Sequence, residues 1–81
     1  MNPERARLHW RCRRGMLELD LLLQGFVTRG YDQLTVQGRT AFEGLLKMPD
    51  NDLLALIYGE AKPADSETAH VVDAIRRAAA P

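Results

Sequence analysis

Arginine, glycine and glutamate come together in the run RCRRGMLELD, residues 11–20. Arg14 directly precedes Gly15, and Glu18 follows three residues later, where one helix should end and the next begin. An Arg–Glu pair at this spacing on a helix surface stabilises by only a few tenths of a kcal/mol, and Arg before Glu is the poorer order. Glycine lets another backbone approach closely. We therefore expect Arg14, Gly15 and Glu18 to form a docking site.

A basic stripe precedes this motif. Arg7, Arg11 and Arg14 fall at positions i, i+4 and i+7, so on one continuous helix they would share a face beside Trp10. Such a face could grip a phosphate backbone or an acidic protein surface, and a merely solvated face explains it nearly as well. A tryptophan at this place is more often a core anchor than a stacking platform.

Other chemistry finds little support in the residue spacing. His9 and Cys12 stand three apart, but two ligands do not make a metal site, and His70 is isolated. We expect a packed cysteine and a half-exposed histidine. No base accompanies the cysteine as a nucleophile would require, and no glycine-rich phosphate loop is present. The sequence therefore argues against an enzyme.

Composition narrows the class further. The chain has 81 residues, enough for one domain, and eleven Lys and Arg balance eleven Asp and Glu. Residues 1–14 hold a local excess of four positive charges, so the basic character is a patch rather than a global field. One cysteine excludes an internal disulfide, and no stretch is long enough to span a bilayer. We expect a cytoplasmic protein whose main partner is not nucleic acid.

The apolar periodicity predicts an all-α fold: a compact single domain over residues 1–81, built from about five short antiparallel helices. The first begins at Asn2–Pro3 and runs to about Arg13, the second spans Met16–Arg29, and the others start at Thr35, Asp50 and Asp65. The predicted core set is Leu19, Leu22, Leu23, Phe26, Val36, Phe42, Leu45, Leu46, Leu53, Leu54, Ile57, Tyr58, Val71, Val72, Ile75 and Ala79.

The run HWRCRRGMLELD, residues 9–20, resembles the signature of the succinate dehydrogenase FAD assembly factors, small bacterial relatives of a mitochondrial succinate dehydrogenase assembly factor. Its centre, Arg-Gly-x-x-Glu, falls on Arg14, Gly15 and Glu18. The runs YDQL (31–34), DNDLLALIYG (50–59) and KPAD (62–65) extend the resemblance over nearly the whole chain. The third predicted helix departs from it, with Gly38 and Arg39 where the resemblance implies a more acidic start.

The resemblance implies a five-helix fold and an assembly function without catalysis. The chain would bind the flavoprotein subunit of succinate dehydrogenase, and of fumarate reductase, and promote covalent attachment of the client's own FAD, holding no cofactor stably itself. A monomer is expected. The implied client-binding residues are Arg14, Gly15, Glu18, Arg11, Arg7, Trp10 and Asp20.

Two other functions stay open. One is a small regulatory or antitoxin-like protein that uses its basic N-terminal helix, which salt-sensitive binding of a random duplex would reveal. The other is a flavin carrier that holds FAD itself, although nothing in the sequence is typical of a dinucleotide pocket.

Overall fold

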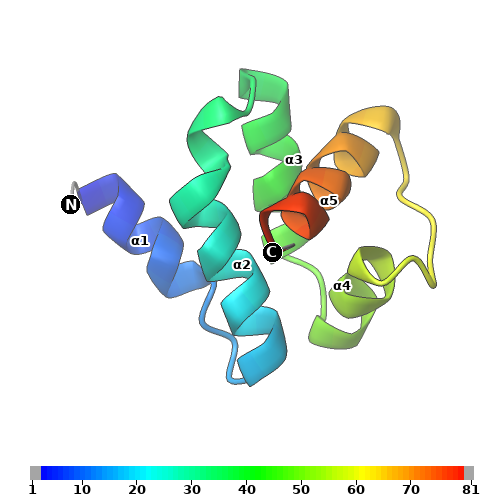
Figure 1. Cartoon of the computed structure of the whole chain (residues 1–81), viewed down its shortest axis with the longest axis horizontal. Coiled ribbons are helices and arrows are strands. Elements are labelled where there is room, and N and C mark those ends of the chain that lie inside the picture. Colours follow the sequence, from blue (N-terminus) through cyan, green and yellow to red (C-terminus); the bar gives the residue numbers. More distant parts are fainter. Residues whose placement is uncertain (1–2, 80–81) are drawn as a thin grey trace.

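The computed structural model describes residues 3–79, and in that range the chain forms five α-helices joined by short connections. The helices are α1 (Pro3–Arg11), α2 (Leu17–Arg29), α3 (Val36–Leu46), α4 (Asp50–Ile57) and α5 (Ser66–Ala79), with a short 3₁₀ turn, η1 (Tyr31–Gln33), between α2 and α3. α5 packs against α2, α3 and α4, while α1 packs against α2 at the edge of the domain (Figure 1). The predicted all-α single domain of five helices is confirmed.

Local sequence signals set most helix ends. The Thr35 hydroxyl accepts a hydrogen bond from the Gly38 amide at 3.1 Å and so caps α3, as predicted. Pro49 stands immediately before α4. The Asp65 carboxylate accepts a hydrogen bond from the Thr68 amide at 2.8 Å. This bond and one from the Thr68 side chain lower the pKa of the Asp65 carboxyl. Because each cap satisfies an otherwise unpaired N–H group, the helices begin where the sequence indicates.

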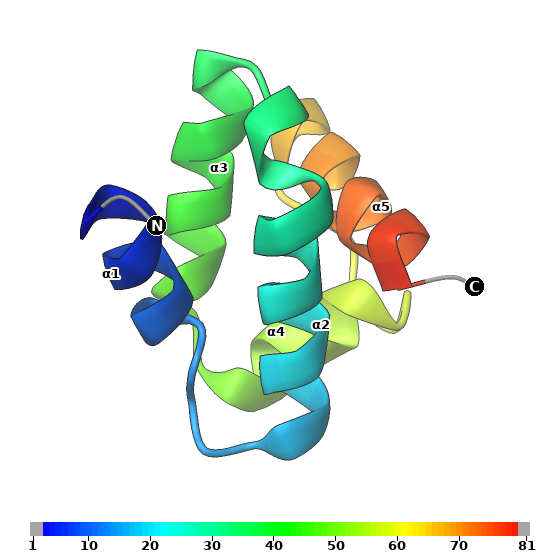
Figure 2. The ribbon, with the colours of Figure 1, turned by 60° about the vertical axis from the view of Figure 1, so that its left-hand side comes forward.

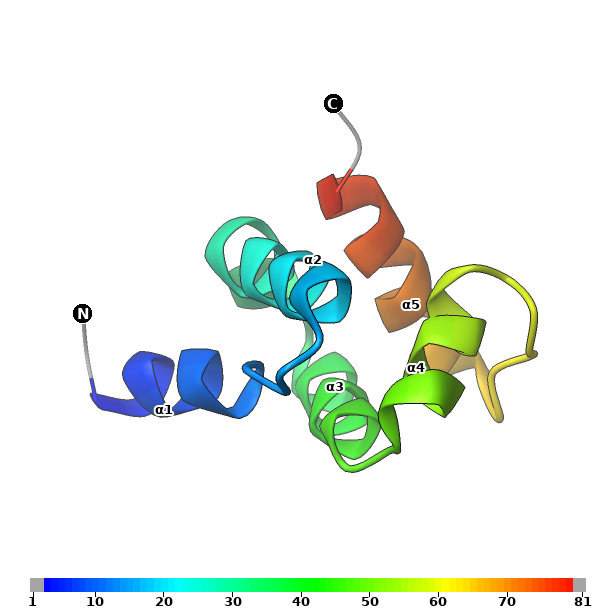
Figure 3. The same ribbon diagram turned by 90° about the horizontal axis from the view of Figure 1, so that it is seen from below.

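The core is one apolar cluster to which every helix contributes. Phe42 of α3 lies between Phe26 and Tyr31, with ring centroids 5.2 and 5.7 Å away, and it is fully buried. In Figure 3 α2, α3 and α5 surround this centre, while α1 and α4 flank it on opposite sides. The remaining buried apolar residues are Leu8, Cys12, Leu19, Leu23, Phe26, Val27, Leu45, Leu46, Leu53, Leu56, Ile57, Val71, Val72 and Ile75.

Several burial predictions were wrong, and each misjudged position lies at a helix end or on the far side of its helix. Val36 begins α3 and is 76% exposed. Tyr58 follows the last residue of α4 and is half exposed, while Leu56 is buried within that helix. Ala79 is exposed and its neighbour Ala78 packs on the core. Trp10 is 70% exposed, so it does not anchor the core.

The two faces of α3 give a matched stability test. Phe42→Ala should lower the free energy of unfolding by about 3–5 kcal/mol, because it leaves a cavity between two rings. Val36→Ala, at an exposed position of the same helix, should change it by less than about 0.5 kcal/mol. Urea unfolding followed by circular dichroism measures both. Equal losses in the two variants would contradict the described core.

Candidate functional site

A tight turn connects α1 to α2 and contains the predicted motif. α1 ends at Arg11, and the chain reverses through Gly15, whose φ of +84° lies in the left-handed region that favours glycine. The carboxylate of Asp20, in the first turn of α2, accepts the Arg14 amide at 2.7 Å and the Gly15 amide at 3.3 Å. Asp20 therefore fixes the backbone of this turn through its side chain.

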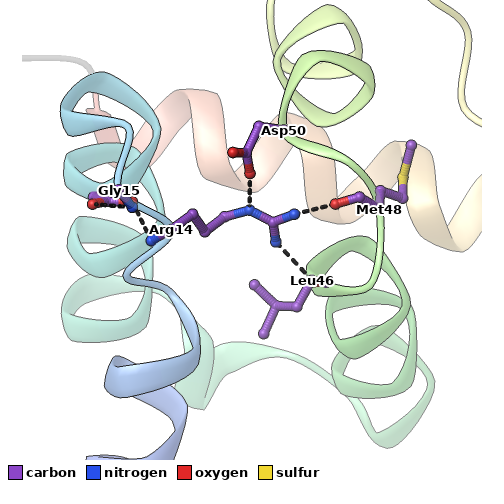
Figure 4. A network of polar contacts seen from close by, with 6 residues as sticks. Arg14, Gly15, Leu46, Met48 and Asp50 are labelled. Atoms are coloured by element: carbon purple, nitrogen blue, oxygen red, sulfur yellow. Dashed lines mark hydrogen bonds and ion pairs between the residues drawn. The ribbon is translucent and has the colours of Figure 1, made fainter.

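Arg14 directs its side chain into the protein rather than outward. Its Nη1 donates to the Leu46 carbonyl at 2.7 Å, its Nη2 donates to the Met48 carbonyl, and its Nε pairs with the Asp50 carboxylate (Figure 4). Only 14% of the side chain is exposed. These partners lie at the end of α3 and the start of α4, so one guanidinium ties the α1–α2 turn to the α3–α4 turn.

The sequence placed Arg14 on the basic stripe of the first helix, and this prediction was wrong. The helix ends at Arg11, and the turn held by Asp20 directs Arg14 away from the face that carries Arg7 and Arg11. Arg14 also pairs with Asp50, whereas the sequence suggested a surface pair with Glu18. Spacing along one element could not reveal a partner 36 residues away.

Gly15 and Glu18 both stand at the surface. Apart from Gly15 and its two chain neighbours, no atom of the described residues lies within 4 Å of the place where a Cβ of residue 15 would be, which leaves the bare spot that the motif indicates. Glu18 is exposed in the first turn of α2. Substituting Gly15 would also strain the backbone, because its φ is positive. Glu18 is therefore the cleaner position for testing contact with a partner.

Exposed apolar side chains surround the motif, and sequence analysis did not single them out as a group. Leu17 and Leu21 of α2 are 74% and 63% exposed, and they lie four residues apart on one helix face. Arg13 lies over the Trp10 ring, 5.7 Å from its centroid. The signal was present in the sequence, since Leu17 and Leu21 fall outside the predicted apolar face of Leu19, Leu22, Leu23 and Phe26.

Arg7 and Arg11 of α1 are exposed but differ in their partners. Arg11 forms an ion pair with Glu43 of α3 at 3.3 Å, and both side chains are largely in solvent. Arg7 is exposed and makes no ion pair or side-chain hydrogen bond with the other residues that the structure describes. Such exposed charges contribute little to stability, so they are available to a partner.

His9 and Cys12, which the sequence offers as possible metal ligands, lie in an environment that the structure defines. In the range 3–79 no three His, Cys, Asp or Glu residues come together as metal ligands. Cys12 is fully buried, and burial raises its pKa from 9.0 to about 11, while the charges of Arg11 and Arg14 act in the opposite direction. The thiol is therefore protonated at neutral pH. His9 is half-buried, so both sequence expectations for these residues are confirmed.

Among the described residues, no helix is both long and apolar enough to cross a membrane. Residues 3–79 define a class of small all-helical domain in which Asp20 and Arg14 hold an exposed turn between the first two helices. Comparison with known proteins makes this class specific.

The family model described as flavinator of succinate dehydrogenase, Sdh5, matches residues 6–79. The FAD assembly factor SdhE of Legionella pneumophila strain Paris is 47% identical over 75 residues, which cover 93% of this chain and 94% of the relative. The SdhE of Shewanella oneidensis is 43% identical over 76 residues, covering 94% and 93%. That of Idiomarina loihiensis is 42% identical over 69 residues, covering 85% and 77%. The chain belongs to this family of succinate dehydrogenase flavinators, and the predicted resemblance is confirmed.

The Cys12 thiol should be chemically inert in the folded protein. A thiol reagent such as DTNB should react far more slowly with the native chain than with the chain in denaturant, because burial keeps the thiol protonated. The pKa is raised on folding, so this group's contribution to stability is full below pH 9.0 and is lost as the pH rises toward about 11. Equal native and denatured reaction rates would contradict the burial.

The Arg14 network predicts a large difference between two neighbouring arginines. Arg14→Ala should lower the free energy of unfolding by about 2–4 kcal/mol, because it strands the Asp50 carboxylate and two carbonyls at the end of α3. Arg13→Ala removes an exposed side chain and should cost less than about 1 kcal/mol. Chemical unfolding of both variants is the measurement, and similar values would exclude the inward role of Arg14.

Proposed function

We propose that this chain is an assembly factor that binds the flavoprotein subunit of succinate dehydrogenase, and that of fumarate reductase, and promotes covalent attachment of FAD to it. The observation that carries the proposal is the exposed Gly15–Glu18 surface, held rigid by Asp20 and Arg14, in a chain of the flavinator family. The family is that of the flavinators of succinate dehydrogenase, which is the same client.

The factor would act through binding energy rather than through catalytic groups of its own. A client conformer that holds FAD with its attachment residue close to the flavin reacts faster than an open one, since the reacting groups are already positioned. A factor that binds this conformer better than others shifts the population toward it. The bond then forms by the client's own chemistry.

We assign FAD to the client because the matching family is described as a flavinator of succinate dehydrogenase, so the flavin belongs to that protein. Within residues 3–79 no buried side-chain nitrogen or oxygen lacks a hydrogen-bond partner, so the interior holds no unsatisfied group that a flavin would complete. The core is filled by apolar side chains. The factor we propose is a monomer that meets FAD only within the client complex.

The proposed interface has a centre and an edge. Gly15 and Glu18 form its centre, and the exposed Trp10 ring adds apolar area beside it. Arg7 and Arg11 lie at the edge as steering charges. Arg14 and Asp20 serve the interface through the turn whose backbone they hold.

The direct test is covalent flavin fluorescence of the succinate dehydrogenase flavoprotein subunit on a denaturing gel. The subunit is expressed in cells that lack their own factor, with and without this chain. The proposal predicts a fluorescent band that is strong only when the chain is present. A band of equal strength in both samples would overturn the proposed function.

Glu18→Ala should reduce this flavinylation severalfold while leaving the melting temperature within about 2 °C of the parent, because the side chain is exposed and holds no structural contact described above. Glu67→Ala is the matched control, since Glu67 is an exposed carboxylate in the first turn of α5, as Glu18 is in that of α2. Equal flavinylation in both variants would remove Glu18 from the interface.

A further inference from the structure

We propose that the groove between α1 and α3 binds an acidic segment of the client flavoprotein, with Arg7 and Arg39 as the residues that receive its carboxylate. This rests on the proposed function and extends the interface from α1 to α3. The feature that carries it is a pair of arginines that line one groove with no carboxylate assigned to either.

The groove is a defined hollow of about 960 Å³, formed by α1, η1 and the outer face of α3. Figure 2 shows α1, in dark blue, beside α3, in green. Tyr31 of η1 and Leu8 of α1 contribute to its lining, together with four arginines. The hollow is large enough for several side chains of an extended segment.

Two ion pairs bridge the groove near its two ends. Arg5 of α1 pairs with Asp32 of η1, and Arg11 of α1 pairs with Glu43 of α3. Between these bridges along both helices stand Arg7 and Arg39, which line the same groove. The groove thus has the carboxylates of Asp32 and Glu43 in its two ion pairs, and two further positive charges stand between those pairs.

Two weak contacts orient the Arg39 guanidinium in the groove. Its guanidinium lies over the Tyr31 ring, 5.2 Å from the centroid, and its Nη2 reaches the Asp32 carbonyl at 3.5 Å. Arg39 forms no ion pair with any residue in the range 3–79. A guanidinium stacked on an aromatic face keeps its N–H edge free for a carboxylate, which it binds in a planar, bidentate manner.

The charges favour an isolated carboxylate over a nucleic-acid backbone. A carboxylate between Arg7 and Arg39 removes their mutual repulsion and restores the alternation of charge along the groove. A continuous phosphate chain would also meet Asp32 and Glu43 on either side, and Glu4 lines the groove as well. The chain as a whole carries no net charge, so no long-range field attracts a polyanion.

The test measures the affinity of the intact chain for the flavoprotein subunit that carries non-covalently bound FAD, purified from cells that lack their own factor, at low and at high ionic strength. Arg39→Glu should weaken binding about tenfold at low ionic strength, and the difference should shrink at high ionic strength. Arg77→Glu makes the same charge change on an exposed face of α5 and should bind like the parent. Arg39→Lys keeps the charge and should retain most of the affinity.

Two further arms make the result decisive. Arg7→Glu combined with Arg39→Glu should weaken binding by less than the product of the single effects, because both arginines hold the same carboxylate. Circular dichroism confirms that each variant is folded. Arg39→Glu binding as tightly as Arg77→Glu would overturn the groove proposal alone, whereas a parent chain that does not bind the subunit would overturn the proposed function too. Binding of a random duplex is measured with the same variants. If Arg39→Glu loses duplex binding while its flavoprotein binding is unchanged, the arginines serve nucleic acid and the groove proposal is wrong.

Discussion

The rest of this domain depends on one interaction, the hydrogen bonding of the Arg14 guanidinium to the carbonyls at the end of α3. The last carbonyls of a helix have no partner within the helix and carry its negative pole, so a cation placed there satisfies and neutralises them together. Other arginines repeat the arrangement across the chain. Arg76 donates to the carbonyls of Leu56 and Ile57 at the end of α4, Arg5 donates to that of Val27 near the end of α2, and Arg29 donates to that of Ala78 in α5. In this way arginines far away in sequence fasten helix ends to one another in a domain with no disulfide.

This use of arginine explains how a basic N-terminal region serves both structure and recognition. Arg14 and Arg5 are turned to carbonyls and carboxylates of other elements, and both are largely covered. Arg7, Arg13 and Arg39 remain exposed. Arg14 holds the turn with Gly15 and Glu18 in one geometry, and Arg5 joins α1 to η1 and to the end of α2. The exposed arginines offer charge to a partner. A rigid backbone that needs no ordering on binding loses less entropy when a partner docks.

Sequence reasoning recovered the features that depend on neighbours in the chain. Thr35 and Asp65 cap their helices as predicted, and Gly15, with a positive φ, lies in the turn between the first two helices. It failed where the deciding contact comes from elsewhere in the fold. The partners of Arg14 lie at residues 46–50, and Trp10 belongs to a helix that packs at the edge of the domain, so its ring reaches solvent. The motif was therefore found from the sequence, but which of its members point outward was decided by tertiary contacts.

The measurement that tests the central claim most directly is the affinity of two α4 variants for the flavoprotein subunit. Asp50 and Asp52 both lie in the first turn of α4, so their replacement by alanine removes the same favourable interaction with the helix N-terminus. Only Asp50 holds Arg14. If Arg14 positions the Gly15–Glu18 surface, Asp50→Ala should weaken client binding severalfold while Asp52→Ala leaves it unchanged, with both variants folded. Equal binding by the two variants would contradict the account.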